Sequence, residues 1–447
     1  MKLICLLKMK FQAKKFSSFF NHSISKIIFL LFITMFQIKS LKAEEFAKFL
    51  SNITKTNSDI QASYFKLKAL EDGKMSTIGQ YLPQAELNYN YQIQDIKNVT
   101  GSIADNFETN EFNLDVTQKI LVPEIRPLLK KTKLNIENAR LEYRRTKSLT
   151  FLEIINILVT IKSLKQQVLF QENNKDLNEN LLKVAKIKSK SGLINEIDLL
   201  QAKTEFLKAK SDFINISKQL SIAIAKYERL TGSSQIQNFN LLKYINNYEF
   251  NLKNTIKKAI ENNFDSMIAR NKLTQYKQEK KIQFADHLPS ADFYYNHQKV
   301  RGRYSYYTDD DEENDLITYG IEVTVPLFSS FKNSSDVKAS SNLILVKEQE
   351  LYKIANHIKQ EVTSIREELN VNLALQKEHE SYVEFAEKSY QAIKSQYDSR
   401  LKDITYLLDA QNTLLDAKSK LNKTNSELIK NYFAIIFLTG KLDEKIF

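Results

Sequence analysis

Four segments of the chain alternate between apolar and polar side chains with a period of two. In the first segment, Ala85, Leu87 and Tyr89 alternate with Glu86 and Asn88. This pattern is typical of β-strands that are apolar on one face and polar on the other. It predicts strands at about residues 84–95, 110–121, 289–300 and 316–327.

Each predicted strand has roughly the 10 residues that a tilted membrane-spanning strand needs. Tyrosines such as Tyr91 and Tyr319 on the apolar face favour a membrane protein, because aromatic residues gather at membrane interfaces. A soluble two-sheet module packed on helices would produce the same alternation. The strands alone therefore leave both alternatives open.

The rest of the sequence predicts very long helices. All five prolines lie in two short windows, at residues 83–127 and 289–326. Because proline interrupts helix interiors, long helices can form in the tracts without it. Leu200, Leu207 and Ile214 are seven residues apart, which is the spacing of a coiled-coil seam. We expect one long helical hairpin in each half of the chain, with tips near residues 190–195 and 398–403.

The two halves of the chain contain the same elements in the same order. Residues 192–232 align without a gap on residues 400–440, and 12 of the 41 pairs are identical. The two Leu-Pro strand entries, at Pro83 and Pro289, are separated by almost the same offset. Such matches indicate an internal duplication. We predict one repeat at residues 44–240 and a second at 241–447, each with a helix, two strands and a helical hairpin.

The N-terminus has the pattern of a secretory signal peptide. Residues 1–26 contain six lysines and no acidic residue, and an apolar run of ten follows from Ile27 to Phe36. Leu41-Lys42-Ala43 is an acceptable cleavage site, so we assign residues 1–43 to the signal peptide. An uncleaved anchor is the alternative. Removal of these residues takes away eight lysines and lowers the formal net charge from +12 to +4.

This processing changes the expected partners. A net charge of +4 gives little support to a nucleic-acid partner, which we therefore do not predict. Cys5, the only cysteine, leaves with the signal peptide, so the mature chain has neither a disulfide nor a thiolate nucleophile.

The number of predicted strands requires more than one chain. In a bilayer every strand edge must be paired, so only closed barrels are stable there. Four strands are too few, because the smallest membrane barrels have eight. We therefore expect an α+β membrane protein in which two, three or four copies share one barrel, extended by long helices.

The paired hairpin motifs resemble the TolC family of outer-membrane efflux proteins. The first copy runs from Gly192 through Asp198 and Ala202 to Leu-Thr-Gly at Gly232, and the second copy ends in the same way at Gly440. The resemblance extends from about residue 45 to residue 440. It implies a homotrimer with a twelve-stranded β-barrel in outer-membrane lipid and an α-helical barrel in the periplasm. It also implies an inner-membrane transporter and a periplasmic adaptor (membrane fusion) protein as partners.

The same resemblance suggests an acidic entrance at the hairpin tips. Family members often place acidic residues just after this turn, lining the periplasmic end of the pore. Asp198 in the first repeat and Asp409 in the second match such positions, whereas Tyr406 replaces another. Carboxylates near a threefold axis would attract cations. Ordinary solvated charges on a coiled coil are the alternative.

Other tip residues are assigned through the resemblance as well. Tyr397 and Lys402 align with positions whose bonds help to hold the family's entrance closed. Arg400 stands where the first repeat has Gly192, so we expect the second tip turn to be built differently.

Two further groups of acidic residues are candidates for a site. The run from Asp309 to Asp315 falls between predicted strands, where a solvated loop is favoured over calcium binding because the glycine of an EF-hand is missing. In addition, each predicted strand carries one acid on its polar face. If that face lines the lumen, the lumen-facing acids are Glu86, Asp115, Asp292 and Glu322.

The sequence gives little support to catalysis. The four histidines after residue 43 lack the spacing of metal ligands, and neither a phosphate-binding glycine loop nor a serine nucleophile motif is present. We predict no enzyme and no cofactor. The predicted function is a passive exit duct for efflux or type I secretion, located in the outer membrane. The alternatives are a soluble periplasmic coiled-coil adaptor or scaffold without a pore, and a secreted filament subunit.

Overall fold

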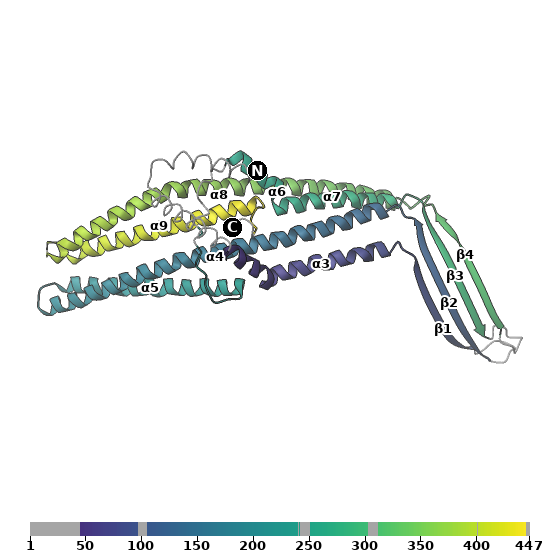
Figure 1. The fold of residues 1–447 in the computed structure, drawn as a ribbon, viewed down its shortest axis with the longest axis horizontal. Coiled ribbons are helices and arrows are strands. Elements are labelled where there is room, and N and C mark those ends of the chain that lie inside the picture. Colours follow the sequence, from purple (N-terminus) through teal and green to yellow (C-terminus); the bar gives the residue numbers. More distant parts are fainter. Residues whose placement is uncertain are drawn as a thin grey trace, which may run out of the picture.

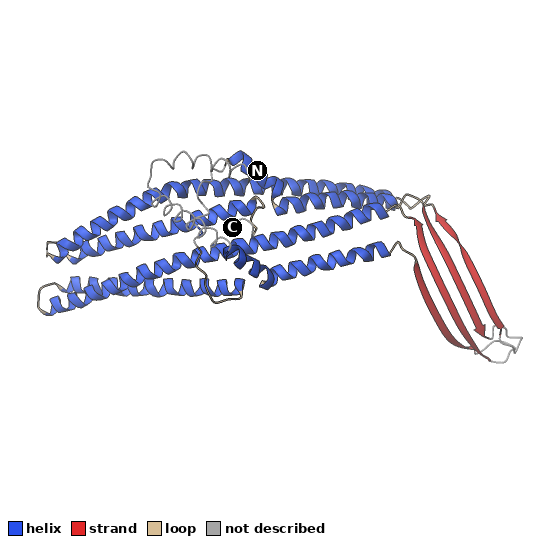
Figure 2. Ribbon diagram, in the orientation of Figure 1, coloured by secondary structure: helices blue, strands red, loops and turns tan. Residues whose placement is uncertain are grey.

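The computed structural model describes residues 45–96, 105–239, 241, 251–302, 312–399 and 401–443. The predicted signal peptide, residues 1–43, lies outside the described residues. The molecule is elongated, with a β-sheet at one end and two helical hairpin tips at the other (Figure 1). Figure 2 shows that the strands are confined to the sheet end, while helices make up the rest.

The sheet has four antiparallel strands in the order β1-β2-β3-β4. Their register is regular, apart from an irregularity between Lys119 and Leu121. Among the described residues, the two outer strands, β1 and β4, are each paired on one side. The strands are β1 (Gln84–Ile96), β2 (Asp105–Leu121), β3 (Ser290–Gly302) and β4 (Glu312–Thr324).

Two strands begin earlier than the alternation predicts. β2 begins at Asp105, and β4 runs from Glu312 to Thr324 rather than over residues 316–327. The second half of the acidic run therefore belongs to a strand and not to a loop; its first half, residues 309–311, lies outside the described residues. Asp315 contacts His297 at 2.7 Å across β3 and β4, and Glu313 pairs with Lys299 there. These pairs were missed because charged cross-strand partners interrupt the apolar alternation.

Long helices connect the sheet to the tips in both repeats. In the first repeat they are α3 (Ser58–Gly79), α4 (Ile125–Lys190) and α5 (Glu196–Thr231). In the second repeat they are α6 (Leu252–Asn262), α7 (Phe264–Ala285), α8 (Lys332–Asp398) and α9 (Ile404–Leu438). Helices α4 and α5 form one hairpin, and α8 and α9 form the other (Figure 1).

The helix that opens each repeat is broken once, whereas the sequence pattern predicts a single helix. A helix over residues 45–56 is followed by α3, and α6 is followed by α7. Asn57 and Asn263 stand at the two breaks and cap the second helix, their side chains accepting hydrogen bonds from its first backbone N–H groups. Side-chain caps of this kind satisfy the free donors at a helix start.

The predicted coiled-coil seam is only partly used within one chain. Ala202 and Ala209 of α5 are buried, whereas the seam residues Leu200, Leu207 and Ile214 are each more than half exposed. On α9 of the second repeat, leucines with the same spacing are buried, including Leu407 and Leu414. The α5 seam therefore points away from the other described residues of its own chain.

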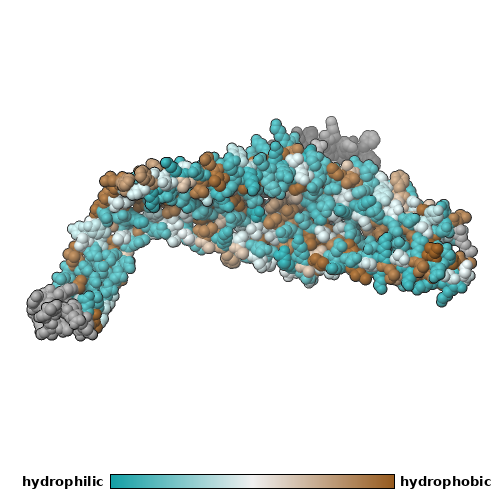
Figure 3. All heavy atoms as spheres, turned by 180° about the vertical axis from the view of Figure 1, so that it is seen from behind, coloured by the Kyte–Doolittle hydropathy of each residue, from teal (hydrophilic) through white to brown (hydrophobic). Residues whose placement is uncertain are grey.

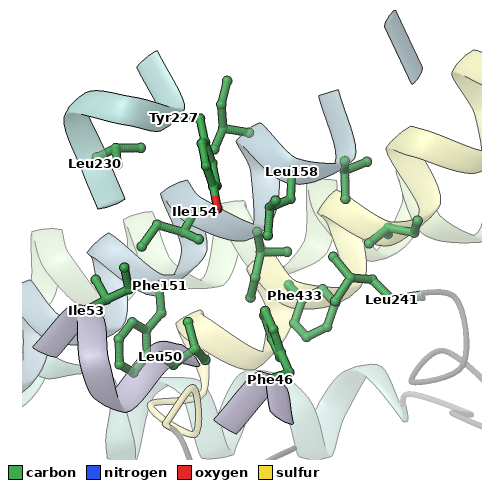
Figure 4. Close-up of a cluster of buried hydrophobic side chains, with 14 of the residues drawn as sticks. Phe46, Leu50, Ile53, Phe151, Ile154, Leu158, Tyr227, Leu230, Leu241 and Phe433 are labelled. Carbon is green, nitrogen blue, oxygen red and sulfur yellow. The ribbon is translucent and has the colours of Figure 1, made fainter. Parts of the chain in front are cut away.

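The largest buried core lies midway along the helices. It joins α4, α5 and α9 to the helix over residues 45–56 and to the segment after α5. Phe46, Phe151, Tyr227 and Phe433 are fully buried there and face one another from four elements (Figure 4). This core fixes the hairpins at the end remote from their tips, so that the tips project from a rigid base.

Candidate functional site

The two tip turns share one backbone bond. After α4, Gly192 has a left-handed φ of 69°, and Leu193 N–H donates to Lys188 O at 2.9 Å. After α8, Leu401 N–H donates to Gln396 O at 2.8 Å. This six-residue closure is typical of a Schellman turn. Arg400 itself lies outside the described residues, so the expected difference between the two turns stays a prediction.

A pocket with a cavity volume of ≈ 270 Å³ lies between the two tips. It brings together three of the predicted site residues: Asp198 from α5, Tyr397 from α8 and Lys402 from the second turn. Lys188 and Asp403, which were not predicted, line it too. The pocket thus contains two cations and two carboxylates, so within one chain it is balanced rather than acidic.

The ring of Tyr397 is held by a cation. The ammonium of Lys188 on α4 lies 5.3 Å from the centre of the Tyr397 ring on α8, which is within the range of a cation–π contact. Burial, followed by the nearby Asp398 carboxylate, raises the pKa of the Tyr397 hydroxyl. The hydroxyl is therefore neutral at physiological pH. This contact joins the two hairpins.

Lys402 makes a different contact. Its ammonium lies 4.1 Å from the centre of the Tyr406 ring, one turn into α9. Tyr406 is 49% exposed and does not line the pocket. Asp409, one turn further along α9, is exposed and also lies outside the pocket. The structure therefore brings Asp198, Tyr397 and Lys402 together, with Tyr406 beside them and Asp409 apart.

The four strand acids share one face of the sheet. Glu86 is directly opposite Asp115, and Asp292 is directly opposite Glu322. Amide side chains join the middle of this face, since Asn296 donates to Asp115 Oδ1 at 2.7 Å and Asn113 donates to Asp115 Oδ2 at 3.0 Å. The face is hydrophilic and internally hydrogen-bonded.

The opposite face is apolar and largely uncovered on the outer strands. On β1, Leu87 is 59% exposed, and on β4, Tyr319 is 71% exposed. Hydrophobic residues also gather where the sheet meets the helices (Figure 3), where Leu327 and Phe328 are exposed. Large exposed apolar surfaces mark contacts with other molecules or with lipid. Among the described residues, no helix combines the length and the apolar character needed to cross a bilayer.

The sequence matches the model of one protein family, described as outer membrane efflux protein, over residues 49–233 and 255–441. The two matched stretches follow the two repeats and together cover most of the chain. The chain belongs to the outer membrane efflux protein family. This assigns it to the outer membrane with its helical part in the periplasm, as predicted, and to a family of channels rather than enzymes.

Individual relatives agree with this family. The chain is 22% identical over 263 residues to the outer membrane protein TolC of Vibrio cholerae, an alignment that spans 57% of this chain and 59% of that relative. The chain thus aligns with little more than half the length of this curated relative.

Solved structures of outer-membrane proteins have the same fold. The Campylobacter jejuni CmeC outer membrane channel superimposes with a TM-score of 0.74 at 14% identity, over 89% of this chain and 86% of that one. The Vibrio cholerae outer membrane protein VceC superimposes with a TM-score of 0.73 at 12% identity, over 88% and 95% of the two chains. The predicted fold class, amphipathic strands with long helices in two repeats, is confirmed.

Membership also decides between the alternatives for the sheet. A soluble adaptor or scaffold without a pore receives no support from the family, whereas a sheet with one apolar and one hydrophilic face fits a family of outer-membrane channels. Lys188 and Asp403 carry no sequence signal of their own, because a lysine before a turn and an aspartate before a helix are common. They are identified as site residues only because they line the pocket between the two tips.

Proposed function

We propose that this chain forms a passive exit duct across the outer membrane. Three copies would join their sheets into a twelve-stranded barrel and their helices into a tunnel through the periplasm. An inner-membrane transporter would supply the energy, and a periplasmic adaptor would connect the two. Small molecules and secreted proteins are both compatible cargo, because the inner-membrane partners would choose the substrate.

The observation that carries this proposal is a four-stranded sheet with two open edges. β1 and β4 each have one unpaired edge, and the sheet is apolar on one side and hydrophilic on the other. In a bilayer an open edge leaves backbone N–H and C=O groups without partners, which costs several kcal/mol for each group. Identical copies remove both edges at once if β4 of one copy pairs with β1 of the next.

The exposed helix surfaces support the same assembly. The α5 seam of Leu200, Leu207 and Ile214 has the spacing of a coiled coil but lacks a partner among the described residues of its own chain. A neighbouring copy or a helical adaptor would cover it. Long helices of mixed polarity gain most of their stability from such lateral packing.

The tips would form the periplasmic entrance. We assign Asp198, Lys402 and Tyr397 to the contact between the two hairpins, and Asp409 with Tyr406 to the exposed surface beside it. Three copies of Asp198 and Asp409 would concentrate negative potential near the axis. The barrel lumen would be lined by the strand acids and would be negative as well; these acids are Glu86, Asp115, Asp292 and Glu322.

Conductance of the purified protein tests this function. The detergent-solubilised protein should have the mass of a trimer, migrate in a heat-modifiable way and produce discrete conductance steps in a planar bilayer. A folded monomer that produces no steps would contradict the proposal. Recovery from the outer-membrane fraction should accompany the conductance.

A further inference from the structure

The apolar face of the sheet is displaced diagonally across the strands. Leu87 of β1 and Ile317 of β4 lie in one row, since the register runs from Leu87 to Leu114, His297 and Ile317. On β4 this row is the last apolar one, because Asp315 and Glu313 follow toward the loops. On β1 the apolar face continues to Ile93, six positions further. The edge of the apolar face therefore falls by six positions from β1 to β4.

A diagonal edge is what tilted strands produce. If strands cross a flat layer at an angle, the boundary of that layer meets each strand at a different position along the register. When the next copy is added, its β1 should therefore be shifted along β4 so that the apolar edges of the two strands meet at the same level. This step rests on the proposed closure of the sheets.

Only a few registers keep the two faces of a joined sheet continuous. Odd-numbered residues of both β1 and β4 carry the apolar face, so an odd position must be opposite an odd position. Displacements of fewer than four residues leave the strands tilted by only about 20° or less, which is too upright for a membrane barrel. Larger displacements place Leu87 of one copy opposite Ile321, Val323 or Val325 of its neighbour. A shift by one residue would place apolar side chains on the hydrophilic face.

Strand tilt excludes the last of these three registers. They displace the strands by four, six or eight residues for each copy of four strands. With a rise of about 3.4 Å per residue and a strand spacing of about 4.8 Å, the tilts are roughly 35°, 47° and 55°. Membrane barrels have tilts of about 35–45°. The first register lies within this range and the second exceeds it by about 2°, whereas the register that pairs Leu87 with Val325 exceeds it by about 10° and is too steep.

Side-chain chemistry decides between the other two. Pairing Leu87 with Ile321 would place Ile93 opposite Asp315 and Glu86 opposite Glu322. Asp292 is already opposite Glu322 and Asp115 opposite Glu86, so four carboxylates would become direct neighbours in a row. Like charges directly opposite each other are destabilising.

Pairing Leu87 with Val323 avoids both conflicts. Tyr89 is then opposite Ile321, Tyr91 opposite Tyr319 and Ile93 opposite Ile317. Every one of these pairs is apolar, and aromatic or β-branched cross-strand pairs stabilise a sheet by about 0.2–1 kcal/mol each. On the hydrophilic face, Glu322 is then opposite Asn88, so Glu86 is a diagonal neighbour of Glu322 and not its direct partner. Ile93 and Ile317, the last apolar residues of their strands toward the loops, are then opposite each other, so the edge of the apolar face continues from one copy to the next.

We infer that β4 of one copy pairs antiparallel with β1 of a second copy in the register that places Val323 opposite Leu87. The partner of this surface is a second copy of the same chain. The register sets the tilt of the whole barrel, and it brings the strand acids of neighbouring copies close together without placing them in direct contact.

Cysteine cross-linking in cell envelopes tests the register, because Cys5 of the predicted signal peptide is the only native cysteine. Leu87→Cys is combined in separate full-length chains with Ile321→Cys, Val323→Cys or Val325→Cys. Directly opposite residues can form a disulfide, whereas residues one row away, roughly 7–8 Å apart, cannot. Leu87→Cys with Glu322→Cys, on opposite faces, is the control.

We expect covalent dimers and trimers on oxidation of the Leu87→Cys/Val323→Cys chain, at roughly fivefold or more the yield of the other pairs. Dominant cross-linking of Leu87→Cys with position 321 or 325 would overturn the register but leave the closure of the sheets intact. No cross-linking in any pair, for chains that reach the outer membrane in normal amounts, would overturn both. Those two failures are thus distinguishable.

Discussion

The Asn57 side chain joins two helices that are far apart in sequence, donating from Nδ2 to Leu230 O at 3.0 Å. The same bond recurs in the second repeat, where Asn263 Nδ2 donates to Leu438 O at 3.2 Å. Both asparagines also cap a helix with their side-chain oxygen, and both are more than 90% buried. The internal duplication therefore preserves a single tertiary bond that ties the helix break of each repeat to the end of its hairpin.

Substitutions at Asn57 should separate its two roles. Asn57→Ala should lower the free energy of unfolding by about 2 kcal/mol, because a cap and a buried hydrogen bond are both lost. Asn57→Asp retains the capping oxygen but loses the donor to Leu230, and should cost about 1 kcal/mol or more. Urea unfolding followed by circular dichroism measures these changes.

The control for this prediction is Asn195→Ala, which removes an exposed cap that accepts from Asp198 N. It should cost clearly less than Asn57→Ala. An equal loss in both variants would mean that the bond to Leu230 contributes nothing.

The two Leu-Thr-Gly glycines should differ in their tolerance of a side chain. Gly232 and Gly440 have nearly the same left-handed φ, of 69° and 67°. A Cβ at Gly440 would lie 2.3 Å from Asn262 O, whereas a Cβ at Gly232 meets nothing within 4 Å. Gly232→Ala should cost about 1 kcal/mol of backbone strain. Gly440→Ala should cost more and lower the thermal midpoint further; equal midpoints would contradict the close approach.

The strands and hairpins were predictable because they depend on local periodicity. Alternation at Leu87 and Tyr89 marks a strand wherever one face is apolar, and the tracts without proline mark the long helices. The helix breaks at Asn57 and Asn263 were not predicted, since an asparagine inside a helical pattern has no distinct periodicity. The repeated Asn-x-Asp motif, at residues 57–59 and 263–265, was the available signal.

The site was predictable only in part, for a geometric reason. Asp198, Tyr397 and Lys402 meet in one pocket because each lies within about two turns of a tip. Which of the neighbouring residues face the pocket depends on the rotation of each helix about its axis, and sequence spacing does not fix that rotation. Asp409 therefore lies apart, and Lys188 was missed.

The contact between Lys188 and Tyr397 should restrain the entrance. Tyr397→Ala should raise the open probability in single-channel recordings, because a cation–π contact worth about 0.5–1 kcal/mol in each copy is lost. Tyr397→Phe keeps the aromatic ring and should behave as wild type. A leaky Tyr397→Phe channel would show instead that the hydroxyl makes the restraining contact.

Asp409 should control the interaction of the entrance with cations. Asp409→Asn removes three negative charges from a trimer and should weaken block by multivalent cations by roughly threefold or more. Asp212→Asn, an exposed aspartate farther along α5, is the matched control and should leave block unchanged. Equal block in wild type and in Asp409→Asn would remove this carboxylate from the entrance.

The ion pair between Glu387 of α8 and Lys418 of α9 should give the second hairpin a pH-dependent stability. The hydrogen bond from Lys418, at 2.8 Å, lowers the pKa of Glu387, and Gln391 lowers it further. A carboxyl whose pKa is lower in the folded state stabilises the fold above its unfolded pKa, near 4.5, and loses this contribution as pH falls through the folded pKa.

Lys418→Met should accordingly lower the free energy of unfolding at pH 7 by roughly 0.5 kcal/mol, since both side chains are partly exposed. The difference from wild type should shrink as the pH falls below about 4.5 and Glu387 becomes protonated in both proteins. Lys423→Met, on the same helix and without an ion pair to any described residue, should show no such pH dependence. Denaturant unfolding between pH 3 and pH 7 measures it, and a difference that persists at pH 3 would show that Lys418 acts through packing of its stem rather than through its charge.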